Sequence, residues 1–210
     1  MSSAMKAASR MWLRATRSAR DLWEDRGAIA ATEFAVIVPI MLVLFFGVVE
    51  FSSAVAVDRK VTIMARTLSD LTSQSPPTGV ADTDLTNYFN AGNGIMQPYV
   101  PANGYPSVRA TISELFIDPN TLQARVQWSK STTGTTPRAT SSIVTIPAGL
   151  AVGNTYLIYS EVSFLYTPTI GYVMKAGVNL SDVAYTRPRQ SVCVIYPAST
   201  NGTTPPCPTL

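Results

Sequence analysis

The stretch that decides the fold of this chain is Ala28 to Val49, AIAATEFAVIVPIMLVLFFGVV. It contains 22 residues and one charge, Glu33, and its part from Phe34 to Val49 carries no charge at all. About 20 apolar residues are needed for a helix to cross the hydrocarbon core of a bilayer. The stretch therefore predicts a transmembrane helix over residues 28–49.

Charges flank this helix unequally. Six basic residues lie before it and are only partly offset by acidic ones, whereas Glu50 follows it at once. The six are Lys6, Arg10, Arg14, Arg17, Arg20 and Arg26. The positive-inside rule then predicts a basic cytoplasmic leader over 1–27 and an external chain from about residue 50. Because the basic segment precedes a membrane helix directly, we interpret it as a topology signal and expect no nucleic-acid partner.

A cleaved signal peptide is the first alternative. The apolar run is longer than an ordinary signal core, and the charged leader before it is long too. Only a weak small-residue cleavage candidate, Ser53-Ala54-Val55-Ala56, follows the run. We therefore favour an anchor that stays in the membrane.

A second helix pattern continues over residues 50–75. Val57, Val61, Met64, Leu68 and Leu71 recur at spacings of three and four, which is typical of an amphipathic helix. It should end before Ser73–Pro77, since paired prolines stop a helix. Its apolar stripe is expected to pack on the rest of the chain, and a seam with other subunits is the alternative.

Residues 76–106 are predicted to be a loop that contains a short helix over 82–92, with Asp82 as N-cap and loop from 93. Leu85, Tyr88 and Phe89 would line one side of that helix.

Over residues 107–190 apolar residues recur at every second position, which predicts β-strands. Expected strands are 108–117, 122–128, 144–146, 156–166 and 183–187, with a turn at Asp118–Thr121 and a polar loop at Ser129–Ser142. Pro188 should end the last strand. The predicted fold class is α+β: a long N-terminal helix packed on a small, mostly antiparallel sheet.

The two cysteines, Cys193 and Cys207, lie in a Pro- and Thr-rich segment, 191–210. An external compartment is oxidising, so we predict a disulfide, with two free thiols on a frayed tail as the alternative. The chain has no histidine, which removes His-based catalysis and leaves too few metal ligands. Beyond residue 75 the chain carries six carboxylates, which are Asp82, Asp84, Glu114, Asp118, Glu161 and Asp182. Two of them could pair for glycoside chemistry, but nothing in their spacing requires it, and no nucleotide-phosphate motif is present. We expect no catalytic residues, no metal, no cofactor and no enzyme activity.

Several segments resemble the TadE-like proteins, pseudopilins of the tight-adherence (Flp/Tad) pilus of bacteria. The resemblance is carried by Asp25 to Ala35, DRGAIAATEFA, by Pro39 and Gly47 to Glu50, and by 54–74. It continues more weakly at Tyr185–Ser191 and Cys193–Pro197. It implies a pilin-like fold, a single pass of the bacterial inner membrane, a periplasmic domain, and contact with other pilins and with platform proteins of pilus assembly.

The resemblance also implies a processing region, Gly27-Ala28-Ile29, for a prepilin peptidase. The family pattern has four residues between Gly and Glu, whereas five separate Gly27 from Glu33 here. A cut measured from Glu33 falls between Ala28 and Ile29, one that requires Gly falls after Gly27, and an uncut chain is the third outcome.

Glu33, Phe34 and Pro39 are the expected helix-contact residues in assembly. The other interpretation of Glu33 is a carboxylate at interface depth, stabilised by the positive end of the helix dipole. The function predicted is a non-enzymatic minor pilin or pseudopilin of a Tad-type adhesion pilus. The alternative is an unprocessed membrane anchor or receptor whose external domain binds an envelope ligand.

Overall fold

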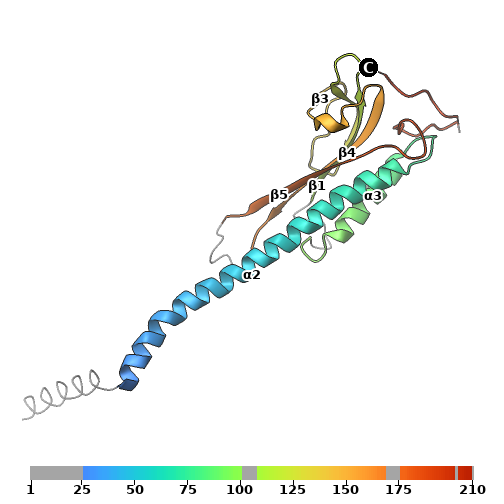
Figure 1. Ribbon diagram of the computed structural model, residues 1–210. Coiled ribbons are helices and arrows are strands. Elements are labelled where there is room, and N and C mark those ends of the chain that lie inside the picture. Colours follow the sequence, from blue (N-terminus) through green and yellow to red (C-terminus); the bar gives the residue numbers. More distant parts are fainter. Residues whose placement is uncertain (1–25, 101–107, 169–175, 202, 210) are drawn as a thin grey trace, which may run out of the picture.

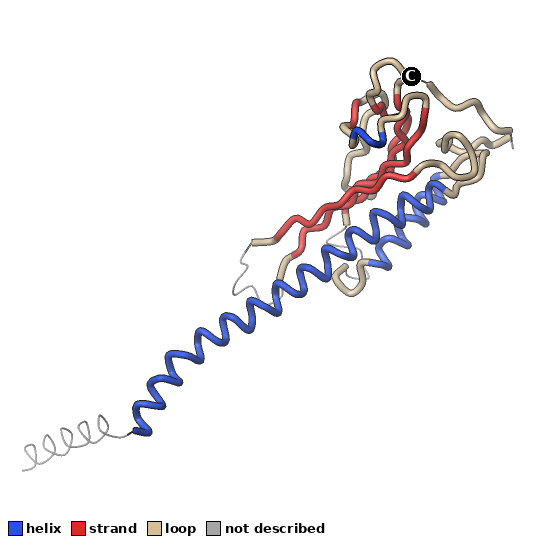
Figure 2. Tube along the Cα trace, in the orientation of Figure 1, coloured by secondary structure: helices blue, strands red, loops and turns tan. Residues whose placement is uncertain are grey.

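The computed structural model describes residues 26–100, 108–168, 176–201 and 203–209. Its main element is one continuous helix, α2 (Arg26–Ser73), which extends far beyond the rest of the protein at its N-terminal end (Figure 1). A second helix, α3 (Asp82–Ile95), lies beside the C-terminal half of α2, and both lie on one face of a sheet (Figure 2). The predicted α+β class is confirmed.

The sheet has five antiparallel strands in the order β3-β2-β1-β4-β5. They are β1 (Arg109–Ile117), β2 (Ala124–Ser131), β3 (Ile143–Val144), β4 (Thr155–Tyr166) and β5 (Val178–Thr186), with a 3-10 turn η1 (Ala148–Leu150) between β3 and β4. The predicted hairpin at Asp118–Thr121 is present, because the Asp118 carboxylate accepts the N–H groups of Asn120 and Thr121.

The core lies between the two helices and the sheet. Val57, Val61, Met64 and Leu68 of α2 are fully buried there, as the sequence spacing predicts, while Leu71 is only half-buried. Burial of such side chains contributes roughly 1.5–3 kcal/mol each. From the sheet this core receives alternate residues of β1 and β4, among them Ile112, Ile158 and Val162.

Several predicted boundaries are wrong by a few residues. α2 includes Ser73, α3 continues to Ile95 into the expected loop, and β2 continues to Ser131. β5 begins at Val178 rather than 183, and β3 is confined to Ile143–Val144. The ends of these helices and strands depend on pairing or packing with distant segments, so they differ from the ends that the local spacing of apolar residues predicts.

Two residue-level predictions are also wrong. The N-cap of α3 is Ala81, and Asp82 is the first helical residue. The side chain that caps the helix is that of Asp84, whose carboxylate accepts the Ala81 N–H. Leu122 lies in the turn with a positive φ of 55° and is half exposed, so it adds nothing to the strand face.

The two faces of the sheet are covered differently. α2 lies over β4 and β5, and α3 packs on α2. On the opposite face, within the described part of the chain, side chains of the β3–η1 region such as Ile146 and Leu150 cover the half near the β1–β2 turn. The other half of that face is polar.

Candidate functional site: the long helix and its docked domain

The N-terminal half of α2 makes almost no contact with the rest of the described chain. Its apolar side chains are exposed by half or more at most positions, for example Phe34 (68%), Leu44 (64%) and Val48 (68%). The helix has a mean hydropathy of 2.6 over its most apolar window. Exposed aliphatic surface of this extent is stable in lipid and not in water. This half of α2 is therefore long and apolar enough to serve as a single-pass membrane anchor.

The predicted contact residues lie together near the start of this half. Glu33, Phe34 and Pro39 are all exposed on α2. Pro39 lies inside the helix, where it has no N–H to donate to the preceding turn, and the N-terminal part of α2 curves (Figure 1). Thr32, next to Glu33, donates to the Ile29 carbonyl of its own helix (2.8 Å).

The predicted processing region lies at the extreme N-terminus of α2. Gly27 and Ala28 are in its first turn, and nothing further is described of their side chains; Ile29 is half exposed. The basic leader up to residue 25 lies outside the described residues. The cleavage register and the roles of Glu33, Phe34 and Pro39 stay predictions.

The C-terminal half of α2 is held on the domain by polar contacts as well as by its apolar stripe. The Ser160 hydroxyl of β4 donates to the Ala65 carbonyl, and the Ser69 hydroxyl donates to Thr186 of β5 (2.8 Å). Small side chains at these positions allow the helix to lie close to the sheet. Lys60 donates to the carbonyls of Ile95 (2.7 Å) and Gln97 (2.8 Å), so a cation lies at the C-terminal end of α3.

The C-terminal strap, residues 189–199, closes the domain over the end of α2. The Arg189 N–H donates to the Ser73 carbonyl and its guanidinium pairs with Asp70 (2.6 Å). Farther along, Val80 donates to the Ile195 carbonyl (2.8 Å) and accepts from the Ala198 N–H (3.0 Å). The strap thus joins the α2–α3 connection to the sheet. The predicted disulfide is present and joins Cys193 of the strap to Cys207, which lies beyond the end of the strap.

Beneath the strap lies a buried carboxyl that the sequence did not single out. Glu114 of β1 is fully buried, and one of its oxygens accepts the Val194 N–H. Its other oxygen accepts no hydrogen bond from the described residues. Burial raises the pKa of Glu114 to about 8, against the opposing effects of the Val194 N–H and of the nearby Trp128 indole. The Trp128 indole N–H donates to the Val194 carbonyl (2.6 Å), so both backbone groups of Val194 are bound.

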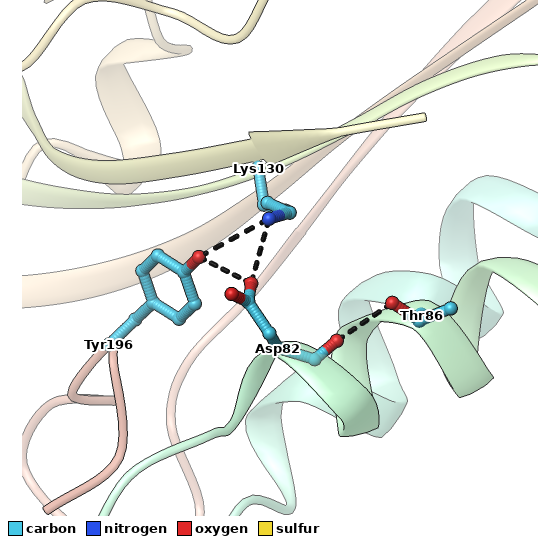
Figure 3. A network of polar contacts seen from close by, with 4 residues as sticks. All are labelled: Asp82, Thr86, Lys130 and Tyr196. Carbon is cyan, nitrogen blue, oxygen red and sulfur yellow. Dashed lines mark hydrogen bonds and ion pairs between the residues drawn. The ribbon is translucent and has the colours of Figure 1, made fainter. Parts of the chain in front are cut away.

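A polar network on the surface holds the other side of the strap (Figure 3). The Asp82 carboxylate accepts from Lys130 of β2 (2.7 Å) and from the Tyr196 hydroxyl. These hydrogen bonds, from Lys130 first and then Tyr196, lower the pKa of Asp82 below its ordinary value. Three distant segments therefore meet at Asp82. Because exposed ion pairs contribute little energy, the network fixes the position of the strap more than it adds stability.

A comparison with protein families finds a match within α2. Residues 28–68 match the family model described as TadE-like protein. This segment is similar to that family, and the match does not extend over the rest of the chain. The TadE-like segment lies wholly within α2 and includes both its exposed apolar half and most of its docked half. Comparisons with curated proteins and with solved structures gave no significant match.

The candidate site is thus an elongated surface rather than a cavity. The sequence predicted its helix, its apolar stripes and its disulfide, all of which have local signals. It did not indicate Glu114 as a buried group, because Glu114 follows the alternation of a strand and its hydrogen-bond partner, Val194, lies far away in the sequence. Among the described residues no group of three Cys, Asp or Glu side chains is placed to hold a metal.

Proposed function

We propose that this protein is a non-enzymatic minor pilin or pseudopilin that takes part in the assembly of a Tad-type adhesion pilus. It would reside in the bacterial inner membrane with its N-terminus cytoplasmic and its domain periplasmic. Its partners would be the lipid bilayer, other pilins, the platform proteins of pilus assembly and a prepilin peptidase.

The observation that carries the proposal is the position of the TadE-like segment. It coincides with the part of α2 where a lipid-exposed helix becomes the spine of a folded domain. One continuous helix couples the two rigidly, so a movement of the anchor in the membrane would move the external domain with it. This geometry suits a subunit that is drawn from the bilayer into an assembly.

Glu33 gives the proposal its specific chemistry. A carboxylate in an otherwise uncharged apolar helix needs a partner when it lies in lipid. After cleavage at Gly27-Ala28-Ile29, the new terminal amine of a neighbouring subunit would supply a positive charge at the same depth. The pairing would fix the depth at which subunits dock.

The test is complementation of a deletion strain, with surface pili and attachment to a surface as the readout. The intact gene should restore both, and Glu33→Gln should reduce both strongly, because the amide cannot pair with an amine as an ion. Thr32→Ala is the matched control, since this neighbouring hydroxyl bonds only within its own helix turn. Normal piliation in the deletion strain would falsify the assembly role.

The mass of the mature N-terminus, measured on protein from the same cells, tests processing separately. A chain that begins at Ala28 or Ile29 would support peptidase cleavage and give its register. An intact leader on assembled protein would remove the peptidase from the list of partners.

The second candidate function is an unprocessed anchor or receptor whose external domain binds an envelope ligand. It is favoured by one observation, a polar groove on the sheet face opposite α2. An anchor of this kind would leave piliation intact in the deletion strain.

A further inference from the structure

The sheet face turned away from α2 carries a groove of about 450 Å³, within the range of small-ligand pockets. Its floor is built from neighbouring strands in register. Arg109 of β1 pairs with Ser163 of β4, and Ser163 pairs with Ser181 of β5. In the next row Thr111 pairs with Glu161. Side chains of directly paired residues lie on the same face of a sheet, so these groups form a polar floor.

One wall of the groove is the loop after β2. Thr132 donates its N–H to the Ala110 carbonyl (2.9 Å), and the Arg138 N–H donates to the Ser129 hydroxyl (3.0 Å). From this wall Arg138 reaches Glu161, whose two oxygens it binds with two N–H groups at 2.6 Å each. The Arg138 guanidinium also lies 5.5 Å from the centre of the Tyr159 ring. The wall is therefore fixed before any ligand arrives.

The charged side chains on this face of the groove are Arg109, Arg138 and Glu161. Asp182 also borders the groove, but it pairs with Val162 of the core beneath α2, so its side chain belongs to the other face of the sheet. Arg138 and Glu161 are bound to each other, and Arg109 makes no ion pair within the described part of the chain. Strong anions such as phosphate are recognised by clusters of arginines, and a single unpaired guanidinium is not such a cluster.

Other classes of ligand fit poorly. The groove offers few aliphatic side chains to a lipid chain, since Val162 is buried and Val183 is the other aliphatic residue that lines it. A peptide added as a strand would need the free N–H groups of the edge strand β5. The Val183 N–H already donates to the Asp182 carboxylate, so the row of free N–H groups along β5 is interrupted and suits an added strand poorly.

We infer that this groove binds an uncharged, polyhydroxylated ligand, a saccharide chain. Sugar hydroxyls both donate and accept, and the lining offers both kinds of partner at fixed positions. The hydroxyls are those of Thr111, Thr135, Thr136, Ser163 and Ser181. The inference names the ligand class for the second candidate function and does not depend on the assembly role, because the groove lies on the sheet and not on α2.

The experiment uses the full chain in a detergent without a sugar headgroup, with binding followed by saturation-transfer NMR. The probes are maltotetraose and the tetramer of N-acetylglucosamine, both neutral, and tetragalacturonate, which is acidic. At least one neutral probe should bind. Ser163→Leu, which fills the floor, and Thr136→Leu, on the loop wall, should each weaken that binding by about tenfold or more.

Thr145→Leu is the matched control, because Thr145 is exposed and lies outside the groove. It should bind like the intact chain, and melting curves check that all three variants are folded. The two groove variants lie on different elements, so misfolding of one leaves the other as a test. The inference is overturned if neither neutral probe binds, if only the uronate binds, or if both groove variants bind as the intact chain does. None of these outcomes bears on piliation.

Discussion

Glu114 is an ionisable residue in a place that favours its neutral form. It is fully buried on the central strand β1, and only one of its oxygens accepts a hydrogen bond from the described residues. Transfer of a charged carboxylate into such a site is costly, so the proton is retained to a higher pH than in water. The neutral carboxyl keeps the Val194 N–H bound and with it the C-terminal strap.

The pH dependence of stability follows from this. The pKa of Glu114 is about 8 in the folded protein, against 4.5 for a glutamate side chain exposed to water. The folded state therefore binds the proton more tightly than the unfolded chain, and stability should fall as the pH rises from 4.5 towards 8. The loss at pH 7 should be on the order of 3 kcal/mol. Denaturant unfolding of the full chain in detergent at several pH values measures it.

Glu114→Gln should remove this slope, because an amide retains the acceptor for Val194 and does not titrate. Asp118→Asn is the control: hydrogen bonds from its own turn lower the pKa of Asp118, so it is already ionised over this range and the slope should stay. An unchanged slope in Glu114→Gln would contradict the assignment to this carboxyl.

At the scale of elements, α2 is one helix in two environments. Its sequence shows this as a change from an unbroken apolar run to an apolar stripe at spacings of three and four. The first half offers apolar side chains on all sides, as lipid requires. The second half offers them on one side, as docking on a sheet requires.

A pair of leucines in this helix tests the division. Leu68 is fully buried against the sheet, whereas Leu44 is 64% exposed. Leu68→Ala should lower the free energy of unfolding of the domain by about 2–5 kcal/mol, through lost burial and the cavity left behind. Leu44→Ala should change it by no more than about 0.5 kcal/mol. Denaturant unfolding in detergent, followed by tryptophan fluorescence, compares them; equal costs would show that the two halves are not energetically distinct.

At the scale of the whole molecule, the C-terminal strap holds together segments that are distant in sequence. It contacts the end of α2, the start of α3, and strands β1 and β2. The disulfide closes the loop that begins within it, with Cys193 buried and Cys207 half-buried.

Reduction of this disulfide should destabilise the domain. A closed loop of about 15 residues corresponds to roughly 3 kcal/mol in the chain-entropy description. Unfolding midpoints of the full chain with and without a thiol reductant measure the effect. The double variant Cys193→Ala, Cys207→Ala is the control, since the reductant should leave its midpoint unchanged. Equal midpoints for the oxidised and reduced chain would mean that hydrogen bonds alone hold the strap.

The sequence by itself determined the features with a local physical cause. The apolar run specifies a helix long and apolar enough to span a membrane. The spacing of Val57 to Leu68 specifies the docked face, and strand alternation on both sides of a turn at Asp118 specifies the hairpin. The resemblance around Glu33 named the family that the comparison then matched over residues 28–68.

Only the tertiary structure decided what depends on contacts between distant segments. Asp82 looked like a helix cap because its neighbours fit one, yet Lys130 and Tyr196 bind its carboxylate instead. Glu114 looked like any polar residue of a strand, yet it is fully buried and its hydrogen-bond partner lies in the strap, some 80 residues away in sequence. Strand ends and the polar groove likewise follow from which strands lie side by side. Such pairings depend on the packing of the whole chain, which no local pattern encodes.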